Sequence, residues 1–281
     1  MVTVTLFKKD NCQGDSFIVA EDITDLKNTP VKHNASSMSL TSDSDKILLF
    51  QKTNYNGDAM FRNGIKQVTK MSSPSKGGKT GFGNTVSSAR CTPFTINLFV
   101  NIIANDDGSF EGLRSSDEEL ETGGFDNFDS FIADIVESAN NVWHNFLIHL
   151  EVSEIVLRKS SKLHDLKNEL YPLLWKDWQK KGNANVYLVR GIHKASGICP
   201  PVGFGKGAVV SCETPTDIAR EGDILAHELG HYFGISKHEE DSQNLMTKHS
   251  DPSAGILTDK QVEEAHKTLT KHIGRTSLRN E

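Results

Sequence analysis

LFKKDNCQGD, residues 6–15, is repeated in modified form as LFQKTNYNGD at residues 49–58. Each copy leads into a short strand-like run and is followed by a serine pair, Ser36–Ser37 in the first unit and Ser87–Ser88 in the second. Alternating apolar residues separated by Gly, Asn and Asp predict strands and turns rather than helices. Two such units predict a pair of Greek keys that pack as a small β-sandwich.

These units resemble the motifs of βγ-crystallin domains, which carry an aromatic residue near the first strand, a turn glycine and a late serine. The resemblance covers residues 3–91 and implies an all-β Greek-key domain over residues 1–91. We expect this domain to have an accessory role in targeting, stability or control.

Some βγ-crystallin motifs bind calcium through two Asn or Asp residues, two variable positions and a Ser/Thr–Ser pair. The resemblance therefore implies Asn84, Ser36 and Ser87 as possible calcium ligands. In the first copy, however, Lys32 and His33 occupy both Asn/Asp positions, and calcium requires hard oxygen ligands. The alternative is that the Asn and Ser side chains satisfy backbone groups of the turns.

The second half of the chain has longer alternations of strand and helix. Strands are predicted at residues 96–103, 148–158, 184–192 and 203–212, and a helix near residues 166–179. Another helix is predicted by apolar residues at helical spacing, which are Phe128, Phe131, Ile132, Ile135, Ala139, Val142 and Phe146. A C-terminal helix is predicted to begin at Thr258, with Gln261 as its capping-box partner. This order predicts an α/β (α+β) domain over residues 92–281.

A chemical signal lies at residues 227–246, HELGHYFGISKHEEDSQNLM. On a helix, His227 and His231 are four residues apart and share one face, with Glu228 beside them. Neutral imidazoles are suitable zinc ligands, and a catalytic zinc site holds three protein ligands and one water. Glu228 lies too far round the helix to bind the ion with the histidines, but it can take a proton from water. Gly234 can end the helix in a left-handed turn.

This segment resembles the metzincin clan of zinc peptidases, whose pattern is H-E-x-x-H-x-x-G-x-x-H followed by a turn that carries a methionine. His227, Glu228, His231 and Gly234 match the pattern place for place. The resemblance implies that Met246 is the turn methionine, which lies beneath the metal and is not a ligand.

The third ligand departs from the pattern by one residue. The expected position holds Lys237, whose ammonium opposes a metal cation. His238 follows directly, and it lies after the helix, where a wider turn can absorb one residue. We expect His238 to complete the metal shell; the carboxylates of Glu239 and Asp241 are the alternatives.

The same resemblance implies that the strand near residues 203–211 forms the edge of the sheet. A protein or peptide substrate would lie extended along it, in a cleft. The cysteines, two in each half, suggest one disulfide per domain, Cys12–Cys91 and Cys199–Cys212. Four unlinked buried thiols are the alternative interpretation.

Composition limits the possible partners. The net charge of −6 and the scattered lysines argue against nucleic-acid binding. No apolar run approaches the roughly 20 residues of a spanning helix, so we expect no membrane span. The N-terminus carries no signal-peptide pattern, but disulfides would favour an oxidising compartment, and we predict a secreted monomer.

The sequence therefore predicts two domains, a βγ-crystallin-like sandwich at 1–91 and a metzincin-like domain at 92–281. The predicted function is zinc-dependent endopeptidase activity, with Glu228 as general base. The alternative is a binding protein in which the zinc site is structural or silent and the crystallin-like half, with its possible calcium ligands, carries the function.

Overall fold

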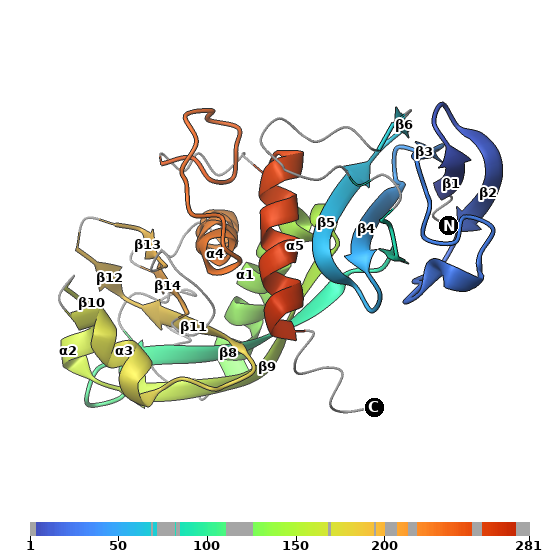
Figure 1. Cartoon of the computed structure of the whole chain (residues 1–281). Helices are drawn as coiled ribbons and strands as arrows, with labels where there is room; N and C mark the ends of the chain where they lie inside the picture. Colours follow the sequence, from blue (N-terminus) through green and yellow to red (C-terminus); the bar gives the residue numbers. More distant parts are fainter. Residues whose placement is uncertain are drawn as a thin grey trace. The chain divides into compact units, whose positions relative to one another are not determined.

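The computed structural model describes residues 4–68, 70–71, 82, 85–110, 126–167, 170–193, 195–199, 207–212, 218–248 and 255–273 (Figure 1). The chain divides into two compact units. The first unit joins Met1–Phe94 to Asp259–Glu281, and the second comprises Thr95–Thr258. The second unit is thus inserted in sequence between two pieces of the first.

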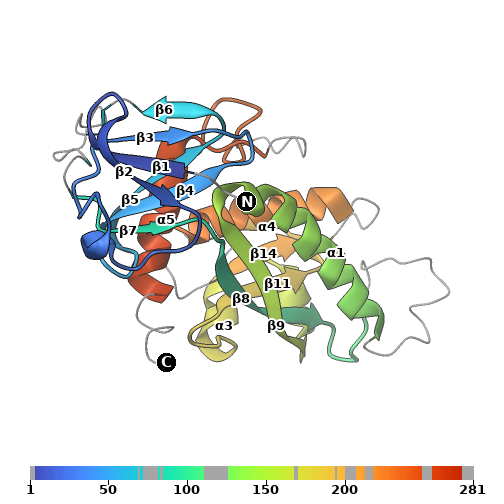
Figure 2. The same ribbon diagram turned by 90° about the vertical axis from the view of Figure 1, so that its right-hand side faces the viewer.

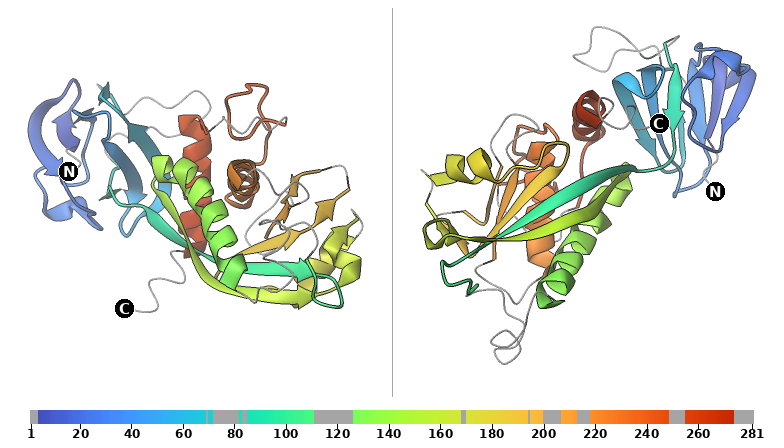
Figure 3. Two further views of the ribbon diagram at one scale, coloured as in Figure 1. Left: turned by 180° about the vertical axis from the view of Figure 1, so that it is seen from behind. Right: turned by 90° about the horizontal axis from the view of Figure 1, so that it is seen from below.

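The first unit contains two antiparallel sheets (Figure 3). One has the order β2 (Gln13–Val19), β1 (Val4–Lys9), β3 (Ser37–Leu40) and β6 (Lys66–Val68). The other has the order β5 (Asn56–Asn63), β4 (Lys46–Lys52) and β7 (Ser88–Arg90), and a 3-10 helix, η1, spans Leu26–Asn28. The third strand of the second repeat, β6, joins the first repeat's sheet, while Ile23 of the first repeat bridges to Ala89 in β7. This exchange makes each repeat a Greek key, as the sequence predicts.

The late serine of each repeat closes the hairpin between its first two strands. In the first repeat, Asn11 and Cys12 lie in the turn between β1 and β2. Both have left-handed backbone conformations, with φ values of 58° and 54°. The Ser37 hydroxyl accepts a hydrogen bond from the Cys12 amide at 2.9 Å and donates to the Lys9 carbonyl at 2.6 Å. Ser37 is fully buried, so its hydroxyl satisfies turn groups that water cannot reach.

The second repeat uses the same device. The Ser88 hydroxyl accepts from the Tyr55 amide at 3.1 Å and donates to the Lys52 carbonyl at 2.7 Å. Asn54 and Tyr55 have φ values of 55° and 56°, nearly equal to those of the first repeat. The sequence repeat is therefore also a repeat of backbone conformation and hydrogen bonding.

The C-terminal helix α5 (Asp259–Ile273) packs on β5 of the first unit (Figure 1). Val262, Ala265 and Leu269 are buried, and the His266 ring lies 5.6 Å from the Phe94 ring, centroid to centroid. Our assignment of this helix to the domain at 92–281 differs from the compact units, which group it with the first. The helical periodicity shows that an apolar face exists, but it does not say which surface receives that face.

Polar contacts reinforce the same packing. The guanidinium of Arg62 in β5 lies 3.1 Å from the Glu263 carboxylate and 3.5 Å from that of Asp259, and Lys267 pairs with Asp58 at 2.7 Å. Because these ion pairs are partly exposed, they orient the helix more than they stabilise it.

Replacing Leu269 by alanine should destabilise the first unit by about 2–5 kcal/mol, because it removes a fully buried side chain from α5, the helix that packs on β5. Hydrogen exchange should quicken in β4 and β5. The three tryptophans, Trp143, Trp175 and Trp178, belong to the second unit, so the tryptophan unfolding transition should not move. Lys260→Ala, at an exposed helical position, is the matched control. A shift of the tryptophan transition alone would show that the helix stabilises the second unit instead.

The second unit is built on a five-stranded mixed sheet. Its order is β13 (Gly197–Ile198), β14 (Ala208–Ser211), β11 (Ala184–Val189), β8 (Phe94–Ala104) and β9 (Ile148–Lys159). The strands β8, β11 and β14 are parallel, and β13 is antiparallel to β14. A small parallel pair, β10 (Asp165–Leu166) and β12 (Gly191–Ile192), lies apart from this sheet.

Helices cover both faces of this sheet. On one face lie α1 (Asp126–Trp143) and α4 (Ile218–Tyr232) (Figure 2). Val186 and Leu188 of β11 adjoin apolar residues of these two helices. On the other face, Tyr187 and Val189 pack in a cluster with Leu163 of α2 (Ser161–His164) and Leu174 of α3 (Tyr171–Asp177). All six residues of β11 are buried, as expected for a central parallel strand.

The predicted helices and their observed limits differ by a few residues. The helix predicted from the Phe128–Phe146 periodicity is α1 followed by a 3-10 turn, η2 (His144–Phe146). The helix predicted near residues 166–179 is only α3, because residues 165 and 166 form β10 and Pro172 falls in the helix's first turn.

Both predicted disulfides are absent: Cys12, Cys91, Cys199 and Cys212 form no disulfide bond. Cys12 lies in the β1–β2 turn, where its thiol contacts the Met38 carbonyl at 3.6 Å, whereas Cys91 follows β7 in the opposite sheet. Burial raises the pKa of the Cys91 thiol to about 12, so this thiol is unreactive. Secretion was predicted from the expected disulfides, and it stays a prediction without support from the cysteines.

Strand register explains why Cys199 and Cys212 do not pair. Gly197 faces Val210 and Ile198 faces Val209, so continued antiparallel pairing would place Cys199 opposite residue 208. Cys212 is four residues further along, about 13 Å at the rise of an extended strand. A disulfide requires Cα atoms within about 7 Å.

An unreduced digest of the native protein should therefore yield the peptides containing Cys199 and Cys212 separately, each alkylated at its own thiol when alkylation follows unfolding. Mass spectrometry reports the masses directly. A linked 199–212 peptide would contradict the β13–β14 register.

Candidate metal centre

The helix α4 places two histidines on one face and ends immediately after the second. Gly234 has φ 99°, and its amide donates to the His231 carbonyl at 3.0 Å, while the Ile235 amide donates to the Gly230 carbonyl at 3.0 Å. This pair of bonds is a Schellman motif, which requires a left-handed residue and therefore favours glycine. The HELGH segment forms the last part of the helix.

Backbone carbonyls fix the orientation of both helical imidazoles. Nδ1 of His227 donates to the Leu245 carbonyl at 2.6 Å, and Nδ1 of His231 donates to the Ile235 carbonyl at 2.7 Å. Since each Nδ1 carries the proton of the neutral ring, each Nε2 holds a free lone pair. Such outer hydrogen bonds typically fix histidine ligands of metals.

His238 brings a third imidazole to the same place. Ligand atoms of His227, His231 and His238 all lie within 4.8 Å of one another, and Nε2 of His231 is 3.1 Å from Nε2 of His238. Two nitrogens bound to tetrahedral zinc would be separated by about 3.3 Å. The loop after Gly234 accommodates the additional residue. A hydrogen bond from the Glu239 amide to the Met246 carbonyl, at 2.8 Å, holds the two ends of this loop together.

The alternative ligands do not join this group in the part of the chain that the structure describes. Glu239 is exposed and pairs through its backbone with Thr247. The Asp241 carboxylate accepts a hydrogen bond from the Gln243 amide at 3.0 Å and is also exposed. Neither carboxylate belongs to the group of ligand atoms in the described part of the chain.

Met246 is fully buried beneath α4. A Cβ atom added to Gly230 would lie 2.5 Å from the Met246 sulfur, so the glycine in HELGH leaves space for the methionine. Gly230 directly precedes His231, so Met246 packs against the helix beside that histidine.

Glu228 faces the edge strand rather than the three imidazole nitrogens. A Cβ atom on Gly197 of β13 would come within 2.6 Å of the Glu228 carboxylate, so this glycine allows the close approach. Glu228 is 6% exposed, and one of its carboxylate oxygens lacks a hydrogen-bond partner among the described residues. It lines a pocket of about 220 Å³ with Ala195, Ser196, Gly197, Ile224, His227, His238, Thr247 and Lys248.

Burial shifts the pKa values of these groups in opposite senses. It raises the pKa of Glu228 to about 8, although a hydrogen bond from the Cys199 backbone acts the other way. Burial lowers the pKa of His231 to about 4 and, to a lesser extent, the pKa values of His227 and His238. All three shifts favour the neutral imidazole at neutral pH, which is the form that binds a metal.

The buried His231 imidazole should make the metal-free protein less stable as the pH falls from about 6.5 to about 4. In this range the unfolded chain protonates residue 231 while the folded chain does not, which costs about 3 kcal/mol in full. Glu228 opposes this trend, because its raised pKa favours the folded state below about pH 8. Thermal unfolding of metal-free Glu228→Gln protein should therefore show the acid loss clearly, and adding His231→Leu should flatten it. An equal slope in both variants would contradict the buried neutral imidazole.

The edge of the sheet is not the strand that we predicted. The segment 208–211 forms β14, and β13 pairs along its outer side, so β13 is the edge strand near the pocket in the described sheet. The prediction was wrong because Gly197–Ile198 is too short to give a strand pattern in the sequence. The sequence analysis also missed Gly197, Thr247 and Lys248 as pocket residues. Thr247 and Lys248 directly follow Met246, and this position could have indicated that they lie near the metal site.

The calcium candidates show no ligand arrangement among the described residues. The Ser87 hydroxyl donates to the Gln51 carbonyl at 2.9 Å and to the Thr85 carbonyl at 3.3 Å, and Ser36 is buried. Asn84 lies outside the described residues. The Ser87 hydroxyl thus bonds to backbone carbonyls, as the alternative interpretation expects.

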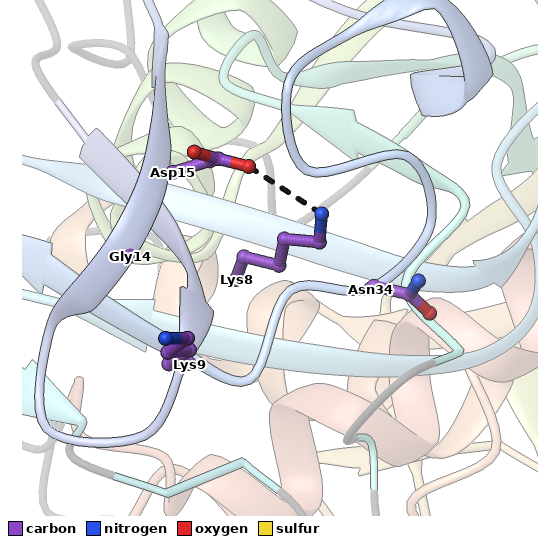
Figure 4. Close-up of a pocket in the computed structure, with 5 residues that line it drawn as sticks. All are labelled: Lys8, Lys9, Gly14, Asp15 and Asn34. Atoms are coloured by element: carbon purple, nitrogen blue, oxygen red, sulfur yellow. Dashed lines mark hydrogen bonds and ion pairs between the residues drawn. The ribbon is translucent and has the colours of Figure 1, made fainter.

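A separate hollow, of about 460 Å³, lies in the first unit beside the β1–β2 hairpin (Figure 4). Its lining residues are Lys8, Lys9, Gly14, Asp15 and Asn34, and Asp15 pairs with Lys8 at 3.4 Å. These residues are exposed, and Asp15, the one acidic residue among them, already pairs with Lys8, so the hollow provides no set of converging ligands.

Comparison with known proteins gives structural likenesses at low similarity. No protein-family model matches the chain, and no curated protein does. Among solved structures, a βγ-crystallin from Ciona intestinalis is 17% identical, with 32% of this chain and 99% of that chain covered and a TM-score of 0.27. Archaemetzincin from Methanopyrus kandleri is 17% identical, with 63% of this chain and 96% of that chain covered and a TM-score of 0.44. Similarity at this level assigns no activity to the chain.

Proposed function

We propose that the second unit is a zinc-dependent endopeptidase. The observation that supports this most is the group of three imidazoles, two of them with Nδ1 fixed by a carbonyl, next to a buried carboxylate that lines a pocket. Three histidine ligands with one open position are typical of catalytic zinc rather than structural zinc, which is usually enclosed by four protein ligands.

The residues fit zinc in both number and chemistry. His227, His231 and His238 would hold the ion through nitrogen atoms, and Met246 would lie below it. When bound, zinc lowers the pKa of a water ligand toward 7 and polarises a carbonyl. The positive charge would also oppose the burial effect on Glu228 and keep its carboxylate ionised at neutral pH.

Glu228 supplies the proton transfers. As the general base it takes a proton from the attacking water, and it then passes that proton to the amine of the cleaved bond. Its position against Gly197 limits its movement, and the pocket side gives it access to the substrate. Proton transfer by a positioned carboxylate contributes about 10²–10⁴-fold to such a reaction.

A peptide would lie along β13. This strand pairs with β14 on one side only within the described sheet, so the backbone groups of its other side can pair with an extended chain. Ala195, Ser196 and Gly197 line the pocket from this segment and bring the substrate backbone close to Glu228. Backbone pairing accepts many sequences and leaves selectivity to the pocket.

Metal analysis combined with a casein digest tests the proposal. The purified chain should contain about one zinc per molecule and cleave casein, and a chelator should stop the cleavage. Bound zinc without any cleavage of casein or of a mixed peptide library would favour a structural or silent site instead.

A further inference from the structure

The pocket carries one cation besides the groups already assigned. Lys248 lines it together with His227, Glu228 and His238. The loop that carries Lys248 is well fixed, because Thr247 pairs with Glu239 and its amide donates to the Asn244 carbonyl at 3.0 Å. The backbone that carries the Lys248 side chain is therefore held in place beside the pocket.

This ammonium has no acidic partner in the described part of the chain. No described carboxylate forms an ion pair with Lys248, and Glu228 is the one acidic side chain among the pocket residues. Other described lysines do form such pairs, for example Lys267 with Asp58 at 2.7 Å. The side chain of Lys248 is exposed and can reach a bound molecule.

Two hydroxyl groups share the pocket with this cation. Ser196 lies in the turn before β13, and Thr247 precedes Lys248; both line the pocket. Among the described residues, neither hydroxyl has a hydrogen-bond partner. An ammonium and hydroxyl donors form a setting that favours a carboxylate over a neutral or cationic group.

We propose that Lys248 selects substrates with a carboxylate close to the scissile bond, supplied either by an acidic side chain or by the C-terminus of the peptide. This inference rests on the peptidase function proposed above. The ammonium pairs with that carboxylate at the mouth of the pocket while the peptide backbone lies along β13.

Paired peptides test the selectivity on the zinc-loaded full chain. The first arm uses internally quenched peptides that differ only by Glu or Gln at one position, scanned across the cleaved bond. The second arm uses one peptide with a free or an amidated C-terminus, cleaved close to that end. One arm should show a preference of about fivefold in kcat/KM for the carboxylate, the range of a partly exposed ion pair. The preference should decrease as salt is raised.

Variants then assign the preference to Lys248. Lys248→Met should bring the ratio to about 1, and Lys248→Glu should reverse it, with zinc content unchanged. Lys237→Met is the matched control, since it removes an exposed lysine of the same loop that does not line the pocket, and it should keep the ratio.

The outcomes separate the two proposals. Cleavage of every peptide with a ratio near 1, or a ratio that Lys248→Met leaves unchanged, overturns the role of Lys248 while the peptidase function stands. Failure of the zinc-loaded chain to cleave any peptide overturns the peptidase function and the selectivity with it. A preference confined to the second arm identifies the chain terminus as the source of the carboxylate.

Discussion

Replacing Glu228 by glutamine should lower kcat for peptide hydrolysis by about 10³-fold, within the range that general base catalysis supplies. Glutamine keeps the shape of the side chain, and its carbonyl oxygen can still accept the hydrogen bond from the Cys199 backbone. It cannot take a proton from water. The variant should therefore fold normally and lose the chemical step.

The zinc content of this variant distinguishes catalysis from metal binding. Because Glu228 faces Gly197 and is outside the group of three imidazoles, Glu228→Gln protein should retain about one zinc per chain. Glu240→Gln changes an exposed acid of the following loop and should leave kcat unaltered. Near-normal turnover in the Glu228 variant would contradict its role as the base.

Replacing His238 by alanine should weaken zinc binding by about 100-fold or more, since even outer-shell substitutions cost 10–100-fold. The remaining two imidazoles belong to one helix and leave half of a tetrahedral shell open. Competition with a fluorescent zinc chelator measures the change. Activity at limiting zinc should fall with occupancy.

Two carboxylate variants decide whether His238 is the third ligand. Glu239→Ala and Asp241→Ala should bind zinc within about threefold of the unmodified chain, because both carboxylates are exposed and outside the imidazole group. Should Asp241→Ala or Glu239→Ala weaken binding more than His238→Ala, the loop would have to rearrange when the metal binds.

Helical spacing made the core of this site predictable from the sequence. His227, Glu228 and His231 occupy fixed angles on α4, and Gly234 ends that helix by a local rule that glycine satisfies. The internal repeat was equally informative, because equal hairpins need equal turn residues, as Ser37 and Ser88 demonstrate.

Features that depend on distant parts of the chain were harder to predict. The sequence could not show that α5 packs on β5, because an apolar helix face does not specify its partner. The cysteine spacing suggested a 199–212 bond, but the register of β13 against β14 keeps these residues apart. The edge strand was missed because two residues are too few to show a period.

Stepwise return of zinc to the chelated protein tests the central claim most directly. Cleavage of a quenched peptide, followed during the titration, should rise from zero and level off at about one zinc per chain, in parallel with zinc binding. Stoichiometric binding of zinc with no cleavage at any point, or cleavage that persists in the fully chelated protein, would contradict the account.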